Sequence, residues 1–424
     1  MAGSAGDKLG LYLSIPFCRS KCTYCNFASG VYPAGDHERY VNRLIADLKA
    51  SPAWASEMGV SLARAVDTIY LGGGTPSLLE PELIARLFAA MRAEFKVEKD
   101  AEITVECAPG QLADATIEAL VKAGVNRVSL GVQSFIDREA QVSGRLHNRA
   151  MVLDDLRRLR GAGIANLNLD LIAGLAGQTY ASWDESLAVL IDTEVPHASV
   201  YMLEVDEDSR LGREMLAGGA RYHADLVPSD EAIARMYETA IERLAAAGLR
   251  QYEISNFARD GFSSRHNLRY WQRRPYLGLG LDASSALEAE KSARPGRLRG
   301  DSGYVLRSKT TDDLKAYLAG PDSELETAVE TAWLSPESQH EEAWFLGLRL
   351  NAGVDPAPLK REFGGKRVAR ALEVVRHLEE DGLVQTVGKN VRLTPRGRLL
   401  SNGVFQEFLG VANAADSLVE SVAH

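Results

Sequence analysis

The chain has 424 residues, of which 46% are hydrophobic and 25% charged, a balance typical of a folded globular protein with two or three domains. Its formal net charge of −10 disfavours nucleic-acid binding, because phosphate backbones are recognised by clustered positive charge. We find neither an apolar stretch long enough to span a membrane nor a secretory signal, so a cytoplasmic location is expected.

The first predicted strand, residues 11–15, leads into three cysteines with the spacing C-x3-C-x2-C, namely Cys18, Cys22 and Cys25. Three thiolates can bind three irons of a [4Fe–4S] cluster and leave the fourth iron open to an outside ligand, whereas electron-transfer clusters usually have four cysteine ligands. A structural zinc site is disfavoured because no second cysteine pair exists, and a disulfide would leave an odd thiol.

Short apolar runs then alternate with segments of helical periodicity, which predicts βαβ units and a parallel sheet. Six units are fewer than the eight of a closed barrel, so we expect an α/β fold, a partial (β/α)6 barrel. The expected strands are residues 11–15, 68–71, 103–105, 127–130, 167–172 and 198–203, and the main expected helices are 37–50, 81–95, 112–123, 149–162, 180–191 and 230–247.

Four segments are expected along the chain: a flexible N-terminus (1–10), the barrel (11–255), a connecting segment (256–330) and a C-terminal domain (331–424). In the last, three helical patterns precede two short strand patterns, which indicates a winged-helix-like module. DNA binding by this module is disfavoured because acidic residues interrupt its basic ones, and packing over the barrel mouth is the favoured role.

Polar residues gather at or just after the carboxyl ends of successive predicted strands, where α/β folds place their ligand sites. The glycines at 72–74 would allow a ligand close to the backbone. Glu106, Gln133, Arg145 and Asp170 offer acceptors for an ammonium or a diol and a partner for a carboxylate. Each alone also suits a solvated loop or a helix cap, but together they indicate a binding rim.

These motifs resemble the radical S-adenosylmethionine (SAM) superfamily, and within it the group of oxygen-independent coproporphyrinogen III dehydrogenase and its heme-chaperone relatives. The similarity covers about residues 10–410 and is carried by residues 15–18, 72–76, 106–110, 127–135, 144–147 and 170–175. The resemblance implies that Cys18, Cys22 and Cys25 ligate a [4Fe–4S] cluster whose open iron binds SAM. The residues it implies for SAM contact are Tyr12, Tyr24, Gly73, Gly74, Thr75, Glu106, Gln133, Arg145 and Asp170.

Two features favour the heme-chaperone (HemW-type) branch of this group. Phe27 stands where the decarboxylating enzyme typically has a fourth cysteine, and residues 266–271 read His-Asn-Leu-Arg-Tyr-Trp, a pattern typical of the chaperones. The resemblance implies that His266 is an axial ligand of heme iron and that Tyr270 and Trp271 stack on the macrocycle. From the residues alone, a loop hydrogen bond of His266 and ordinary packing of the aromatic rings would be the simpler interpretation.

The expected function is a cytoplasmic heme chaperone that binds the cluster, SAM and heme and transfers heme to acceptor proteins such as respiratory enzymes. An electron donor for the cluster is implied, and transient contact with membrane-bound acceptors stays open. The alternatives are SAM-dependent oxidative decarboxylation of coproporphyrinogen III and radical chemistry on another substrate. Ser14 and Ser285 stand where many relatives have histidine, which leaves the heme geometry open, and no catalytic residue is assigned.

Overall fold

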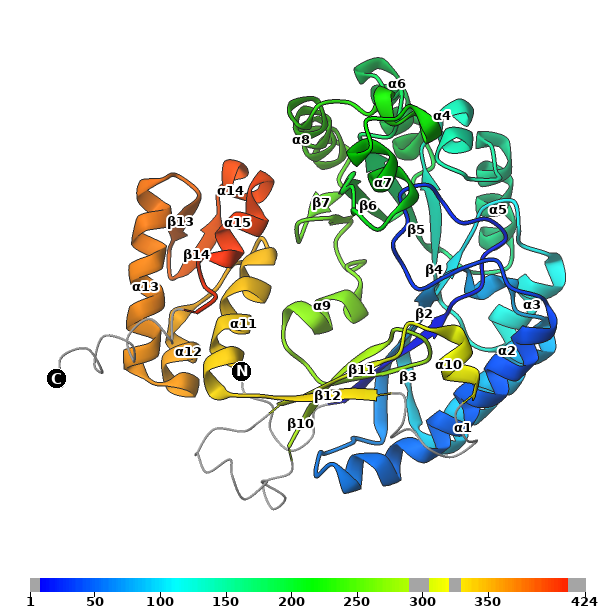
Figure 1. The fold of residues 1–424 in the computed structure, drawn as a ribbon, viewed down its shortest axis with the longest axis horizontal. Coiled ribbons are helices and arrows are strands. Elements are labelled where there is room, and N and C mark those ends of the chain that lie inside the picture. Colours follow the sequence, from blue (N-terminus) through cyan, green and yellow to red (C-terminus); the bar gives the residue numbers. More distant parts are fainter. Residues whose placement is uncertain (1–7, 290–304, 320–328, 411–424) are drawn as a thin grey trace.

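The computed structural model describes residues 8–289, 305–319 and 329–410 (Figure 1). Its centre is a row of six parallel strands, which confirms the α/β fold with a partial barrel. Their bounds are β1 Leu9–Ile15, β2 Ala65–Gly73, β3 Lys96–Cys107, β4 Arg127–Gln133, β5 Asn166–Ala173 and β6 His197–Met202.

Alternate residues of these strands have different surroundings, because successive side chains of a strand point to opposite faces. In β4, the apolar side chains of Val128, Leu130 and Val132 are fully buried in the main core. The intervening positions carry polar or small residues, Arg127, Ser129 and Gly131, and face the inside of the curved sheet. The strand pattern therefore supplies an apolar outer layer and a polar barrel interior.

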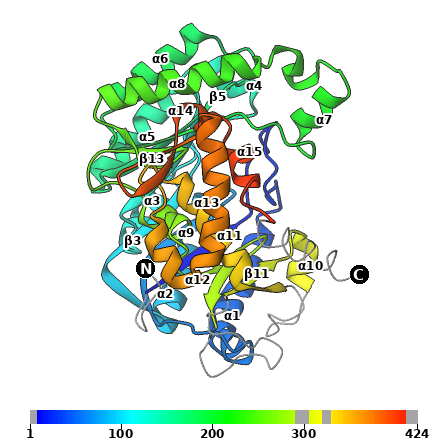
Figure 2. The ribbon, with the colours of Figure 1, turned by 90° about the vertical axis from the view of Figure 1, so that its left-hand side faces the viewer.

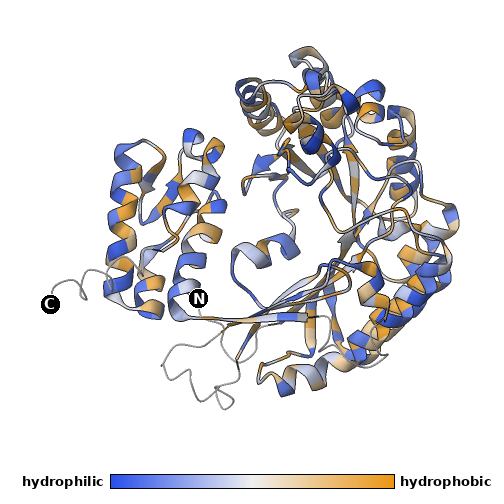
Figure 3. Cartoon of the chain, viewed as in Figure 1, coloured by the Kyte–Doolittle hydropathy of each residue, from blue (hydrophilic) through white to orange (hydrophobic). Residues whose placement is uncertain are grey.

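Helices cover the outer side of the curved sheet (Figure 1), and their amphipathic colouring is visible in Figure 3. Tyr40, Leu44 and Leu48 show the pattern in the first helix, where they lie in the main core. The helices of this region are α1 Gly35–Glu57, α2 Pro81–Glu94, α3 Asp114–Lys122, α4 Asp137–Val142, α5 Arg149–Gly161, α6 Tyr180–Asp192, α7 Arg210–Leu216 and α8 Asp230–Ala246, with 3-10 turns at Pro76–Leu78 and Arg221–Leu226.

The segment expected to be a connection, 256–330, instead adds strands to the sheet and a short helix, α9 Arg265–Trp271. The added strands are β7 Arg250–Gln251, β8 Asn256–Ala258, β9 Tyr276–Leu279, β10 Ser284–Glu288, β11 Val305–Thr310 and β12 Val329–Leu334, and helix α10 is Leu314–Ala319. The sheet order is β12-β11-β10-β9-β1-β2-β3-β4-β5-β6-β8-β7. Each of these strands has at most six residues, which leaves too little alternation in the sequence to predict it.

The boundaries of the expected segments also change. Strand β1 begins at Leu9 and overlaps the N-terminus expected at 1–10, of which residues 1–7 lie outside the described residues. At the other end, β12 extends to Leu334 and still pairs with β11, so the sheet ends after residue 331. The described residues contain no helix that is both long and apolar enough to cross a membrane.

The C-terminal domain contains three helices followed by a hairpin, as expected, and has its own core around Trp344, Val368 and Phe408. Figure 2 shows its helices side by side. The elements are α11 Pro336–Arg349, α12 Pro356–Phe363, α13 Gly365–Glu380, β13 Val384–Val387, β14 Asn390–Leu393, α14 Pro395–Leu399 and α15 Ser401–Gln406. The backbone N–H of Asn351 donates to Tyr252 O at 3.0 Å, which joins this domain to the barrel.

Candidate functional site

The three cysteines of the C-x3-C-x2-C motif lie in one loop after β1. Cys18 N–H donates to Gly30 O at 2.8 Å, which closes the loop on itself. Among the described residues, no three His, Cys, Asp or Glu side chains converge on a single-ion position. The loop supplies three thiols, one fewer than the four ligands of a structural zinc site, and three thiolates can each bind a separate iron of a cluster. The donor set of this loop therefore suits a [4Fe–4S] cluster better than zinc.

Cys18 is the thiol whose ionisation the loop changes most clearly. Burial raises the pKa of Cys18, and the hydroxyls of Thr75 and Ser29 oppose that rise. The thiol form is therefore favoured in the metal-free loop at neutral pH. Metal ligands must be deprotonated, so iron loading of this loop has to release protons.

The glycine turn after β2 lies directly against the cysteine loop. Gly73 has φ +96°, and a Cβ there would lie 2.7 Å from Ser14 Oγ. A Cβ on Gly74 would lie 2.8 Å from the carbonyl oxygen of Phe17, next to Cys18. Thr75 continues the contact, with its Oγ1 3.8 Å from Cys18 Sγ. The turn needs glycine because the two loops meet backbone to backbone.

Glu106 and Asp170 lie on the inner side of the sheet, near the carboxyl ends of β3 and β5. Tyr70 Oη donates to Glu106 Oε1 at 2.8 Å. Burial, the largest cause, and the nearby charge of Asp170 raise the pKa of Glu106 to about 7. Ser129 and Asn168 donate to Asp170 at 3.1 and 2.7 Å, while burial raises its pKa. Both carboxylates are thus half-buried in a polar environment.

The supporting residues Tyr70, Ser129 and Asn168 were not predicted from the sequence. A signal for them was present, because each is a polar residue at an inward position of a strand whose neighbours are buried apolar residues. Strands of a parallel sheet are usually apolar on both faces. Polar residues two positions before a predicted ligand residue, as in Asn168 before Asp170, therefore indicate partners of the site.

Gln133 and Arg145 complete the rim at the end of β4. Gln133 has φ +68°, a left-handed backbone that is uncommon for residues other than glycine and clusters at functional sites. Arg145 donates to Gly131 O, and its Nη1 lies 3.5 Å from Cys22 Sγ. Arg145 therefore touches the strand end and the cysteine loop together.

The two predicted tyrosines lie on either side of this rim. The Tyr12 ring on β1 is 6.2 Å from the Tyr70 ring. Tyr24, in the cysteine loop, packs against an apolar cluster that includes Ile172 and Leu203. The structure thus places most residues predicted for SAM contact in the carboxyl-terminal halves of β2–β5 or in the cysteine loop, with Tyr12 in the middle of β1 and Arg145 in the loop after α4.

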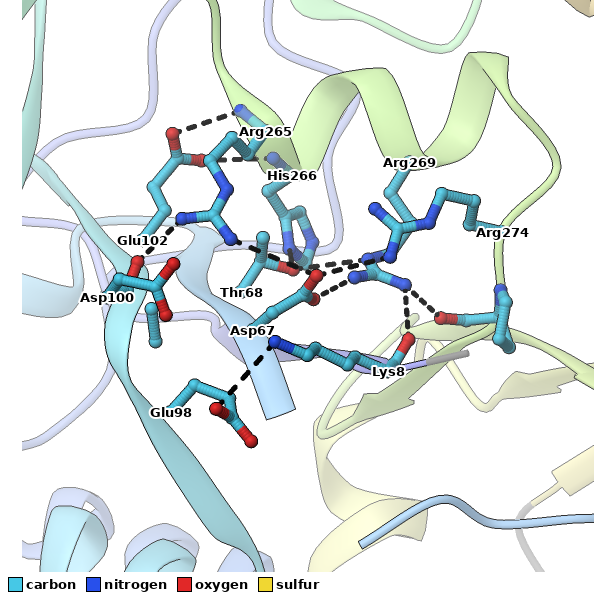
Figure 4. Close-up of polar contacts among 12 residues, drawn as sticks. Lys8, Asp67, Thr68, Glu98, Asp100, Glu102, Arg265, His266, Arg269 and Arg274 are labelled. Atoms are coloured by element: carbon cyan, nitrogen blue, oxygen red, sulfur yellow. Dashed lines mark hydrogen bonds and ion pairs between the residues drawn. The ribbon is translucent and has the colours of Figure 1, made fainter. Parts of the chain in front are cut away.

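Helix α9, which was not predicted, lies at the opposite end of the barrel interior, between the sheet and the C-terminal domain (Figure 1). Its N-terminus is held by Glu102, whose carboxylate accepts from the backbone N–H groups of Arg265 and His266 at 3.0 Å each (Figure 4). Farther along the helix, Arg269 forms a buried ion pair with Asp67. Residues 265–271, for which the sequence predicted no helix, therefore form a helix anchored by carboxylates of β2 and β3.

His266 is fully buried, with Nδ1 3.0 Å from Thr68 Oγ1 and Nε2 2.8 Å from Tyr270 Oη. Burial, followed by the charges of two arginines, lowers its pKa to about 3, so the imidazole is neutral at neutral pH. Its ring centre is 5.3 Å from that of Tyr70 and 6.5 Å from that of Tyr12. His266 and Tyr270 are therefore linked to the predicted SAM rim through aromatic rings.

Trp271 is not part of the aromatic contacts that link His266 and Tyr270 to the predicted SAM rim. Its ring lies under the guanidinium of Arg349 from α11, with the carbon 4.2 Å from the ring centroid. Its indole Nε1 is buried without a hydrogen-bond partner in the described part of the chain. Trp271 thus faces the C-terminal domain, and only Tyr270 of the aromatic pair contacts His266.

Comparison with known proteins gives two domain matches and several full-length relatives. A radical SAM superfamily model matches residues 12–190, and a HemN C-terminal domain model matches residues 334–400. The chain is 32% identical to the heme chaperone HemW of Lactococcus lactis, over 94% of this chain and 96% of the relative. It is 33% identical to the heme chaperone HemW of Bacillus subtilis, over 94% of this chain and 98% of the relative.

Among solved structures, coproporphyrinogen III oxidase (HemN) from Escherichia coli, described as a radical SAM enzyme, superimposes with a TM-score of 0.78. The alignment covers 96% of this chain and 91% of that chain at 23% sequence identity. At this identity the likeness establishes the fold, including a C-terminal domain beside the sheet.

Proposed function

The chain belongs to the heme chaperone HemW family of the radical SAM superfamily, and on this premise we propose that it binds a [4Fe–4S] cluster, SAM and heme and delivers heme to acceptor proteins in the cytoplasm. The acceptors we propose are heme proteins such as respiratory enzymes, including membrane-bound ones contacted transiently. An electron donor for the cluster is part of the proposal.

The observation that carries the proposal is the glycine turn at 72–74, which touches both halves of the site. On one side, Gly74 N–H donates to Ile15 O at 2.9 Å, next to the cysteine loop. On the other side, a Cβ on Gly72 would lie 3.1 Å from the Glu106 carboxylate. A ligand bound at the turn would therefore meet the thiol loop and the carboxylate together, as SAM on the open iron of a cluster must.

The residues of the rim have separate tasks in this proposal. A bound and reduced cluster supplies the electron for reductive cleavage of SAM. Glu106 and Asp170 accept hydrogen bonds from the ammonium or ribose hydroxyls of SAM, and Arg145 pairs with its carboxylate. Tyr12 and Tyr70 cover the inner side of the rim and limit water access. In these roles the rim residues orient SAM, and none of them is assigned to proton transfer on a substrate.

Glu106 is expected to make SAM binding depend on pH. Its pKa of about 7, against an ordinary value of 4.5, means that the carboxyl is partly protonated at neutral pH and must lose that proton to accept from SAM. SAM affinity should therefore rise about tenfold between about pH 6 and about pH 8, because binding releases a proton. Calorimetric titration of the reconstituted protein measures this, and Glu106→Gln should flatten the profile.

Two outcomes separate Glu106 from other titrating groups. Tyr70→Phe removes the donor that stabilises the ionised carboxylate, so the rise in SAM affinity should move to higher pH. A profile that is unchanged in Glu106→Gln would contradict the assignment. Since the folded-state pKa is raised, the free energy of unfolding of the ligand-free protein should fall as pH rises from 4.5 to about 7.

We propose that heme contacts α9 through the His266–Tyr270 pair. Neutral imidazole is the form that ligates iron, and the low pKa of His266 supplies it. Because Nδ1 and Nε2 are both hydrogen-bonded in a buried ring, ligation requires Nε2 to exchange Tyr270 for iron. Trp271, which faces Arg349, would contact the macrocycle only with the ring face that Arg349 leaves free.

This exchange predicts opposite effects of two neighbouring substitutions on heme affinity. Tyr270→Phe removes the competing hydrogen bond, worth about 1 kcal/mol, and should raise heme affinity about fivefold. His266→Ala should lower it by at least that factor. The matched control is His340→Ala, which removes a buried histidine of the C-terminal domain that bonds Trp344. Absorbance titration with heme measures all three, and weaker binding by Tyr270→Phe would contradict ligation by His266.

Anaerobic reconstitution with iron and sulfide, followed by two assays, tests the function. The first measures heme binding by the reconstituted protein. The second measures protoporphyrinogen formation from coproporphyrinogen III with SAM and a reductant. Heme binding without decarboxylation is the expected result, and clear decarboxylation would replace the chaperone proposal with the enzyme alternative.

A further inference from the structure

A buried arginine without a partner lies in the barrel interior, outside the groups used so far. Arg127 is the first residue of β4 and is 1% exposed. Its Nε is buried without a hydrogen-bond partner, and no carboxylate of the described residues forms an ion pair with it. A guanidinium N–H buried without an acceptor is costly, because that donor has left water without a replacement hydrogen bond.

A second unpartnered donor lies beside it on the neighbouring strand. Thr104 of β3 is fully buried, and its Oγ1 also lacks a hydrogen-bond partner. Thr104 and Arg127 are register partners in the parallel β3–β4 pair, so their side chains leave the same face of the sheet. The next register pair on that face, Glu106 and Ser129, belongs to the proposed SAM rim. The two donors therefore lie one row of side chains below the rim.

The charge of Arg127 affects titratable groups in both parts of the proposed site, namely the SAM rim and the heme contact on α9. The charge of Arg127 lowers the pKa values of Glu106 and Asp170 at the rim, partly offsetting the larger rise from burial. It also contributes to the low pKa of His266 in α9, where burial is the larger cause. An anion bound by Arg127 would thus be close to both SAM and the proposed heme ligand.

We propose that Arg127 and Thr104 form a carboxylate-binding subsite that holds a propionate of bound heme. This inference rests on the proposed heme binding. Guanidinium and hydroxyl donors together match the two oxygens of a carboxylate. The carboxylate of SAM is the other source of the same chemistry, and the experiment below distinguishes the two.

The test compares heme with heme dimethyl ester, whose propionates are esterified and uncharged. Wild-type reconstituted protein should bind heme about tenfold or more tightly than the diester, as expected for a hydrogen bond to a charged group. Arg127→Met keeps an unbranched apolar side chain but removes the guanidinium, and it should bind both alike. Thr104→Val, which removes only a hydroxyl, should reduce the preference to a few-fold and bind SAM as the wild type does. Arg127→Met should bind SAM as the wild type does at a pH high enough to ionise Glu106, whose pKa rises when the guanidinium is removed.

Three results would overturn the subsite. Arg127→Met that retains the preference for heme would show that the propionate binds elsewhere. Arg127→Met with lost SAM affinity and unchanged heme affinity would assign Arg127 to the carboxylate of SAM. A wild type that binds neither heme nor the diester would reject the proposed function, and the inference with it.

Thermal melting of the ligand-free protein separates a binding role from a structural one. At a pH low enough to protonate Glu106 and Asp170, whose ionised forms Arg127 favours, removal of the buried charge should raise the melting temperature of Arg127→Met by about 2 °C or more. A lower melting temperature would show that the protein itself satisfies Arg127 and would contradict the subsite. Failure of Arg127→Met to fold would contradict the subsite for the same reason. In that case Thr104→Val tests whether the preference for heme over its dimethyl ester depends on the Thr104–Arg127 pair.

Discussion

Cys18→Ala, reconstituted anaerobically with iron and sulfide, is expected to bind no stable cluster and to lose SAM binding. Cys18 is the thiol that Thr75 of the glycine turn contacts, so its loss removes a ligand that faces the predicted SAM rim. Two thiolates cannot hold a cubane cluster that already has one iron without a protein ligand. Iron analysis, visible absorbance and calorimetric SAM titration measure the loss, which should be complete.

The matched control is Cys107→Ala. Cys107 is the one cysteine outside the loop, and it lies buried at the end of β3, where burial raises its pKa to about 12. Cys107 lies on β3 and not in the loop that carries the other three cysteines, so Cys107→Ala should bind the same amount of iron as the wild type. A full cluster in Cys18→Ala, or a loss of iron in Cys107→Ala, would contradict the assignment of the loop.

Asp67→Asn is expected to give the largest loss of stability of any single change at the base of the barrel. The Asp67 side chain is 7% exposed and pairs with Arg269, whose side chain is fully buried. Arg274 Nη2 approaches the same carboxylate at 3.1 Å (Figure 4). Removal of one partner of a buried ion pair leaves an uncompensated charge, which costs about 3–5 kcal/mol of unfolding free energy. Urea denaturation followed by circular dichroism measures it.

Glu98→Gln provides the control for Asp67→Asn. Glu98 pairs with Lys8 at 3.7 Å, and both side chains are partly exposed, so this pair should contribute at most about 1 kcal/mol. An Asp67→Asn variant no less stable than Glu98→Gln would show that the α9 anchor does not stabilise the barrel. Heme and SAM affinities of Asp67→Asn would then report on α9 position alone.

Much of the barrel and of the cofactor rim could be predicted from the sequence because both rest on local patterns. Apolar strands alternating with amphipathic helices specify βαβ units, and polar residues at strand ends meet at one edge of a parallel sheet. The cysteine loop is contiguous in the chain. Residues such as Glu106 and Asp170 therefore lay at the expected places without knowledge of any long-range contact.

The parts that were missed depend on contacts between distant segments. Helix α9 has seven residues, and the carboxylate that holds its N-terminus is Glu102, which contacts His266 across 164 positions of the chain. Such a short segment has little helical tendency of its own and forms because the tertiary structure satisfies its N–H groups. Likewise, Arg127 looks in the sequence like an ordinary strand residue, and only its register with Thr104 shows that two donors lack partners.

The distinction between a heme carrier and a decarboxylating enzyme is tested most directly by heme transfer. Reconstituted, heme-loaded protein is mixed with the heme-free form of a b-type cytochrome, and the two are separated and analysed by absorbance. We predict that heme leaves this chain and appears on the cytochrome, while coproporphyrinogen III added with SAM and reductant stays unchanged. Heme that remains on the chain while coproporphyrinogen III is converted to protoporphyrinogen would contradict the proposed carrier function.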